Sequence, residues 1–335
     1  MPPILGTLRR MVLTPKLRAV TFAHRGFPGA GSPSAEHLEL IPQSVICGFE
    51  WGIEHRSLWD VERRLETVAP EQRGFAYEGA AMAYTVRDAM AGGRGLKPSS
   101  KARELLLGPG RPHIFLTYIG IGFAMARLPR VLWKTVLPDL DGSPYHPTMS
   151  WLAVDGYGFD RAYFDTRKIV DEQREIEPYP WAGAPEYFPR AVDQGIGRAL
   201  WFINGAQPDL VVKAVNAFPA HRRADLWSGV GLAATFAGGA RAADLAEVRA
   251  AAGEHAAEVA LGAVFAIKAR SYAGYVPEHT ELGAELLAGL PLGAAVALAN
   301  STAVDANATG PGGTPAYELW RERIRDHFRP VAKAA

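Results

Sequence analysis

One carboxylate stands in an apolar stretch of the sequence. Glu78 lies within RGFAYEGAAMAYT (73–85), whose other residues are mostly small or aromatic. On a helix, residues three or four positions apart share a face, so Glu78 would point the same way as Phe75. An unpaired buried carboxylate is costly, so it takes up a proton or finds a cation and hydrogen bonds. We expect Glu78 to be either a structural ion-pair partner of Arg198 or Lys268, or a working acid or anchoring group.

Other polar residues also stand in apolar surroundings. Glu78, His113 and Asp193 are the candidate catalytic residues, because carboxylates and imidazoles with perturbed pKa values transfer protons in clefts. A hydrogen-bonded core position is the alternative for each of them. Candidate ligand-binding residues are the polar, aromatic and glycine positions of the same segments: Tyr77, Gly79, Asp155, Arg198, Trp201, Trp227, Gly229, Gly231, Lys268, Arg270 and His279.

The spacing of possible ligands argues against a bound metal. No histidine follows a glutamate by three residues, as helical di-iron sites require, and neither an H-E-x-x-H motif nor a cluster of cysteine and histidine is present. GFEWGIEH (48–55) and GEHAAE (253–258) could supply ligands, but solvated helix faces explain both. The sequence also lacks a G-x-S-x-G motif and a P-loop. We therefore expect no metal and no cofactor.

Gly-x-Gly units recur at 120–122, 156–158, 195–197 and 229–231. The last, GVGLAA, fits the dinucleotide-binding fingerprint, which needs a strand directly before it, whereas HRRADLW precedes it in helix-like surroundings. A glycine inside a helix costs about 1 kcal/mol relative to alanine, so something must compensate. Either the glycines let helix backbones approach closely, or they line a narrow slot for a flat ligand. We expect no nicotinamide or flavin there.

Three pairs of similar segments occur in the same order along the chain. The pairs are 41–53 with 188–200, 61–85 with 211–235, and 113–126 with 255–268. The second pair matches Arg73 with Arg223 and Glu78 with Ser228. Chance similarity in an alanine-rich chain is the alternative, but the constant order favours a divergent duplication.

Helical periodicity between Pro- and Gly-rich breaks predicts an all-α fold with few or no strands. We expect one compact unit of two related helical halves, 31–172 and 173–310. A basic amphipathic arm (1–30) would precede them. A C-terminal docking helix and tail (311–335) would follow, because its apolar residues form one stripe.

Composition excludes several functional classes. The 335 residues carry a net charge of +1 without a run of one sign, so no basic face for nucleic acid is expected. The most apolar segments, 114–126 and 286–299, are shorter than the roughly 20 residues that span a bilayer. A single cysteine rules out an intramolecular disulfide and fits a reducing compartment. We expect a cytoplasmic protein that is not an integral membrane protein.

Five segments resemble the UnbL-type proteins encoded in enediyne polyketide gene clusters: RGFAYEGAAMA, VDGYGFDRAYF, DQGIGRALWF, RADLWSGVGLA and KARSYAGYVPEHTEL. The similarity runs from about Arg25 to Arg325. It implies a role near the iterative polyketide synthase, between the linear conjugated polyene and the enediyne core, without assigning a reaction. Asp160 stands where the resemblance leads us to expect a histidine, which argues against proton transfer at that position.

A rigid apolar polyene is the ligand that a glycine-lined slot between helices would suit. One hypothesis is an enzyme that modifies the polyene or a later core intermediate. Another is a non-catalytic protein that binds and shields it, and a third is a scaffold for partner biosynthetic enzymes. Catalysis would require polar groups that converge on the slot.

Overall fold

A computed structural model describes residues 7, 10–11, 14–54, 57–91 and 100–329. Within these ranges every regular element is a helix, apart from a single β-bridge between Thr309 and Pro315. The predicted all-α class is therefore confirmed. Three parts of the segments discussed above lie outside the described residues. They are most of residues 1–13 of the expected N-terminal arm, His55 of the GFEWGIEH segment, and the tail from residue 330.

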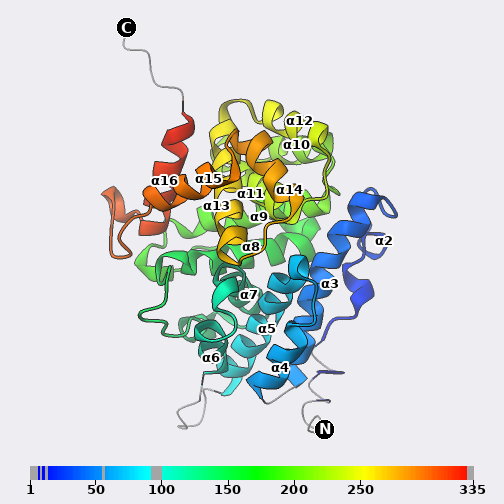
Figure 1. Ribbon diagram of the computed structural model, residues 1–335, viewed down its shortest axis with the longest axis vertical. Helices are drawn as coiled ribbons and strands as arrows, with labels where there is room; N and C mark the ends of the chain where they lie inside the picture. Colours follow the sequence, from blue (N-terminus) through cyan, green and yellow to red (C-terminus); the bar gives the residue numbers. More distant parts are fainter. Residues whose placement is uncertain (1–6, 8–9, 12–13, 55–56, 92–99, 330–335) are drawn as a thin grey trace.

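The long helices form a row in which each helix packs against the next one along the chain. Figure 1 shows them succeeding one another from α3 in blue and α5 in cyan, through the green helices, to α13 in yellow. The row consists of α3 (Pro33–Glu54), α5 (Pro70–Ala91), α7 (Ile114–Arg127), α8 (Trp151–Phe164), α9 (Phe188–Ile203), α11 (Ala220–Ala237) and α13 (Ala256–Tyr272).

Shorter helices connect and cover this row. In the first half they are η1 (Leu17–Val20), α2 (Phe22–Arg25), α4 (Leu58–Leu65), α6 (Lys101–Leu107), η2 (Arg111–His113), η3 (Arg130–Thr135), η4 (Thr148–Ser150) and η5 (Arg167–Asp171). In the second half they are η6 (Trp181–Gly183), α10 (Pro208–Ala217), α12 (Ala242–Ala252), η7 (Gly253–His255), α14 (Glu278–Gly283), η8 (Ala284–Ala288), α15 (Leu292–Ser301), η9 (Pro311–Gly313) and α16 (Ala316–Phe328).

Each Gly-x-Gly unit lies in a helix that is packed between two others. Residues two positions apart on a helix point to nearly opposite sides, so the first glycine faces the preceding helix of the row and the second faces the following one. A Cβ atom on Gly229 would overlap the carbonyl oxygen of Gln194 in α9, and one on Gly231 would overlap that of Val259 in α13. The units in α7, α8 and α9 repeat this arrangement.

These contacts decide between the two interpretations of the glycines. A Cβ on Gly79 would overlap the carbonyl oxygen of Val45, so Gly79, Gly229 and Gly231 all touch a neighbouring backbone. They do not line a ligand slot, and that interpretation was wrong for these three positions. GVGLAA lies inside α11, where helical residues from Ala220 onward precede it instead of the strand that a dinucleotide fingerprint requires.

The row curls so that helices far apart in the chain come together. The Phe75 ring of α5 meets the Phe236 ring of α11 edge-on, with centroids 5.4 Å apart. The Arg270 guanidinium of α13 donates to the Glu71 carbonyl oxygen of α5 at 2.8 Å. The curl gives the row an inner face.

The element order of the first half recurs in the second. The series α3, α4, α5, α6, η2 and α7 corresponds to α9, α10, α11, α12, η7 and α13. Arg73 at the start of α5 donates to the carbonyl oxygens of Val68 and Glu66, and Arg223 of α11 donates to the matching pair of carbonyl oxygens. These parallels favour the duplication, which stays a prediction.

The contacts correct the register that we assigned to the first segment pair. A Cβ on Gly48 would overlap the carbonyl oxygen of Ala76, and one on Gly197 would overlap that of Leu226. Ala76 and Leu226 are matched in the second pair. Gly48 therefore corresponds to Gly197 by contact, two residues beyond the expected Gly195.

Among the described residues, the helical stretch 242–272 is long and apolar enough to cross a bilayer, and the bent pair Glu278–Ala288 with Leu292–Ser301 would count as a second span. In the first stretch, 61% of the most apolar window is buried inside the protein. Core helices of globular proteins have the same length and composition, so this is weak evidence for a membrane.

Candidate functional site

Two adjoining apolar cavities lie on the inner face of the row. The first has about 740 Å³ of space free of protein atoms, its open mouth included, between side chains of α3, α5, α7, α8 and α9. The second has about 470 Å³ of such space, again with its open mouth included, and is lined mainly by α5, α7, α11 and α13. Phe75, Glu78 and Arg198 line both cavities, so these three side chains form the partition between them.

The residue after each Gly-x-Gly unit lines a cavity. These residues are Phe123, Phe159, Arg198 and Leu232. The two glycines of a unit face the flanking helices, so the following position, a further 100° around the helix, points to the inner face of the row. Sequence reasoning missed the three apolar members, although the recurrent pattern could have identified them.

Glu78 is 3% exposed, and no described residue forms a hydrogen bond or ion pair with its side chain. Burial raises the pKa of Glu78 to about 8; the positive charge of Arg198 opposes the rise and the negative charge of Asp155 adds to it. The carboxyl group is therefore mainly protonated at neutral pH. A neutral acid of this kind can donate one hydrogen bond or one proton to a molecule in either cavity.

The two cations that we expected beside Glu78 have other partners. Arg198 contacts one carboxylate oxygen of Asp155, which lies 2.7 Å from Nε and 2.5 Å from the terminal nitrogen. Lys268 donates to the Asn300 side chain at 2.7 Å. The expected ion pair with Arg198 or Lys268 was therefore wrong. At the partition, the charge of Arg198 is therefore neutralised by Asp155, and Glu78 is a separate, neutral acid.

A second ion pair lies at the outer end of the first cavity. Arg127 of α7 binds both carboxylate oxygens of Asp160 in α8, at 2.6 and 2.8 Å. The Arg127 side chain is 39% exposed and that of Asp160 3%. Burial raises the pKa of Asp160 to about 6, and the Arg127 charge opposes this rise. Asp160 therefore serves to hold an arginine at the rim.

The other two candidate catalytic residues do not reach the cavities. The His113 ring stacks on Tyr77 with centroids 4.7 Å apart. Burial, with the charges of Arg73 and Arg270, lowers the pKa of His113 to about 4. Asp193 is paired with Arg222, whose terminal nitrogen lies 2.5 Å from one carboxylate oxygen. The structure does not bring Glu78, His113 and Asp193 together.

Several candidate ligand-binding residues have structural contacts instead. The Tyr77 hydroxyl donates to the Glu66 carboxylate at 3.1 Å. Trp201 donates to the Gly238 carbonyl oxygen at 2.8 Å, and Trp227 is 1% exposed in the core. Arg270 and His279 gather at the C-terminal end of α11. Of the residues chosen from the sequence, Glu78 and Arg198 line the cavities and Asp155 binds Arg198.

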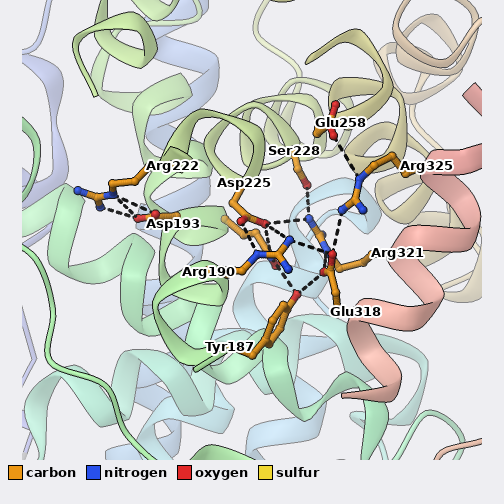
Figure 2. A network of polar contacts seen from close by, with 11 residues as sticks. Tyr187, Arg190, Asp193, Arg222, Asp225, Ser228, Glu258, Glu318, Arg321 and Arg325 are labelled. Carbon is orange, nitrogen blue, oxygen red and sulfur yellow. Dashed lines mark hydrogen bonds and ion pairs between the residues drawn. The ribbon is translucent and has the colours of Figure 1, made fainter. Parts of the chain in front are cut away.

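A buried polar network fixes α16 against the row (Figure 2). Glu318 is fully buried and accepts hydrogen bonds from the Tyr187 hydroxyl at 2.6 Å and from three arginines, 190, 321 and 325, at 2.9 to 3.0 Å. Burial alone would raise the pKa of Glu318, but the three positive charges outweigh it and hold the pKa at about 2.

The same network includes Ser228, which the repeat alignment matches with Glu78. Its hydroxyl accepts from Arg321 at 3.0 Å, and Asp225 on the same helix binds Arg190 at 2.9 Å. Figure 2 shows the Asp193–Arg222 pair to one side of this network. α16 contributes the buried side chains of Tyr317, Trp320 and Ile324 to the core.

Comparison with known proteins gives one match. A family model described as "Protein of unknown function (DUF1702)" matches residues 4–328. No curated protein and no solved structure matches the chain. The family description assigns no reaction, so any functional argument depends on the geometry of the cavities.

Proposed function

The chain belongs to the DUF1702 family of proteins of unknown function, and we propose from its cavities that it binds an elongated apolar small molecule. The observation that carries this proposal is a pair of adjoining cavities walled by apolar side chains of several helices and separated by Phe75, Glu78 and Arg198. The linear conjugated polyene of enediyne biosynthesis, implied by the resemblance to UnbL-type proteins, is the ligand class that we assign to it.

The charges in the interior support an apolar ligand. Arg198 is already compensated by Asp155, and Glu78 is mainly protonated, so neither cavity offers an uncompensated charge to an ionic ligand. A hydrocarbon chain has no polar groups to satisfy and gains about 25 cal/mol per Å² of apolar surface removed from water. Rigid ligands also lose little conformational entropy on binding.

The residues of the cavities favour a protein that binds and shields the polyene over an enzyme that modifies it. An isomerisation or cyclisation by proton transfer needs an acid on one side of the ligand and a base on the other. Glu78 could serve as the acid, but Asp155 is held by Arg198, and neither His113 nor Asp193 lines either of these two cavities; His113 lines a separate pocket with Arg270. In this proposal the protein receives the polyene in the cytoplasm from the iterative polyketide synthase and passes it to neighbouring enzymes.

The proposal can be tested with diphenylhexatriene, a neutral linear polyene that fluoresces in apolar surroundings. Met82→Trp fills the first cavity and Leu232→Trp the second, whereas Leu40→Trp adds the same ring on the exposed face of α3. We expect saturable binding that weakens at least about tenfold with a filled cavity and is unchanged in Leu40→Trp. Overpacking typically costs about 1–3 kcal/mol, so thermal melts must show that each variant is folded.

Equal affinities in all three folded variants, or no saturable binding by the parent, would contradict the proposal. In a producing strain, protein purified from cells that make the polyene should carry it, as shown by mass spectrometry. The Met82→Trp protein should carry less of it, and Leu40→Trp should carry the parental amount.

A further inference from the structure

Three side chains with metal-binding atoms converge outside the two cavities. His37 lies on α3, Glu71 on the first turn of α5 and His279 on α14. One nitrogen or oxygen from each lies within 4.8 Å of the others, and the distance from His279 Nδ1 to a Glu71 carboxylate oxygen is 3.8 Å. The imidazole rings meet edge-on with centroids 5.7 Å apart.

We infer that His37, Glu71 and His279 form a binding site for a divalent transition-metal ion such as Zn²⁺. Two histidines and one glutamate are a ligand set that zinc accepts, with a fourth position left for water or another ligand. Zinc–ligand distances of about 2.0–2.2 Å require the three atoms to move together by about 1 Å. All three side chains are half-buried, so solvent has access to them.

The hydrogen bonds of the imidazoles prepare them for a metal. His37 Nε2 lies 2.7 Å from the Ala237 carbonyl oxygen, and His279 Nε2 lies 3.1 Å from that of Phe236. A carbonyl oxygen can only accept, so each Nε2 carries a hydrogen, and in the neutral form of each ring the lone pair is on Nδ1. A metal-bound histidine almost always donates its other ring N–H to a carbonyl or carboxylate in this way.

The backbone at the end of α11 supplies both carbonyl groups. Gly238 and Gly239 have φ values of +72° and +91°, which turn the chain away from the helix axis and leave the last carbonyls open. A Cβ on Gly238 would lie 2.7 Å from Cγ of His279, so a glycine is needed for the ring to occupy its place. The turn that ends α11 thus orients both histidines.

Capping of α11 alone would explain the two hydrogen bonds, and a positive charge nearby opposes a cation. The Arg270 guanidinium donates to the Phe236 carbonyl oxygen at 2.6 Å and to that of Glu71 at 2.8 Å. Capping does not explain why the Glu71 carboxylate faces the Nδ1 side of His279. The negative charge of Glu71 also acts on Arg270, and a bound metal would use this acidic group and both imidazoles together.

Variants can separate capping from metal binding. Glutamine in place of histidine keeps an N–H donor for the carbonyl group but removes the Nδ1 lone pair. The full chain is stripped of metal with a chelator, and zinc chloride is titrated by calorimetry. We expect one Zn²⁺ per chain, with affinity at least about tenfold weaker in His37→Gln, His279→Gln and Glu71→Gln. His146→Gln, in the more exposed group with Asp139 and Asp141, is the matched control and should bind as the parent does.

The inference is overturned if the parent binds no Zn²⁺, if the three variants bind as tightly as the parent, or if His146→Gln alone loses binding. Should one variant fail to fold, the other two decide. Co²⁺ gives an independent readout on the unmodified chain: visible absorption bands typical of a four-coordinate ion support the site, and a spectrum of hydrated Co²⁺ overturns it. Neither measurement depends on the polyene, because none of the three side chains lines either cavity.

Discussion

Glu78 keeps its proton at neutral pH because it is buried without a cation of its own. The pKa of its carboxyl group is about 8 in the folded chain, against 4.5 for an ordinary glutamate. The folded state therefore holds this proton more tightly between these two pH values. Stability from the group is fully present below pH 4.5 and is lost as the pH rises through about 8.

Replacing Glu78 by glutamine should remove this pH dependence. The parent should lose stability as the pH rises, whereas Glu78→Gln should not lose this contribution. The free energy of unfolding of the variant minus that of the parent should therefore increase with pH, by on the order of a few kcal/mol. Urea denaturation across this range measures the difference. Glu285→Gln, on the exposed part of η8, is the control. If Glu78→Gln and the parent lose stability in parallel, the carboxyl group is not held protonated.

Glu318 shows the opposite behaviour, because three arginines surround its carboxylate. Glu318→Gln leaves those arginines without their shared anion and should lower the free energy of unfolding by about 3–5 kcal/mol. With a pKa lowered from 4.5 to about 2, the contribution of Glu318 is present above pH 4.5 and is lost as the pH falls through about 2. Denaturant titrations at neutral and acidic pH should show the penalty shrinking with acidity. A penalty that is the same at both pH values would contradict this account.

The sequence identified some members of the partition but not their partners. Glu78, Asp155 and Arg198 were chosen because each is charged in apolar surroundings, and they do lie close to the cavities. Helical spacing shows which face a residue shares within its own helix. It carries no information on which arginine meets which carboxylate across helices, and for that reason Arg198 was matched to Glu78 instead of Asp155.

At the scale of the helix, the Gly-x-Gly units allow neighbouring helices of the row to approach closely. They also place the following residue on the inner face of the row. Periodicity was sufficient to predict helices, because apolar residues recur at intervals of three and four. The choice between helix packing and a slot required the neighbouring backbones, which no local pattern encodes. The three histidine and glutamate ligands come from α3, α5 and α14, so spacing could not have indicated a metal site either.

A methyl group at a packing glycine should separate the helices. Gly229→Ala places a Cβ against the Gln194 carbonyl oxygen, and we expect a loss of about 1–3 kcal/mol in the free energy of unfolding. Gly293→Ala on α15 has no atom within 4 Å of the new Cβ, so it should leave stability unchanged or slightly raised. Chemical denaturation measures both. Similar effects at the two positions would show that close packing at Gly229 is not limiting.

At the scale of the whole molecule, the duplication predicts equal roles for matched residues. Arg73 and Arg223 each donate to two carbonyl oxygens of the segment that precedes their helix. Because both arginines are partly exposed, Arg73→Ala and Arg223→Ala should each cost about 1–2 kcal/mol. Denaturation curves of the two variants provide the comparison. A large loss in one variant and none in the other would argue against equivalent halves.

The order of helices in the row bears on how the chain folds during synthesis. Each long helix packs against the helix that precedes it, so contacts can form as soon as the next segment emerges. The polar network is different, since Glu318, Arg321 and Arg325 all belong to α16, the last helix of the described chain. Until α16 is made, Arg190 and Asp225 have each other but lack their other charged partners. Arg190 and Asp225 therefore acquire these partners only after α16 has been synthesised, and a chain cut short before α16 would leave both groups without them.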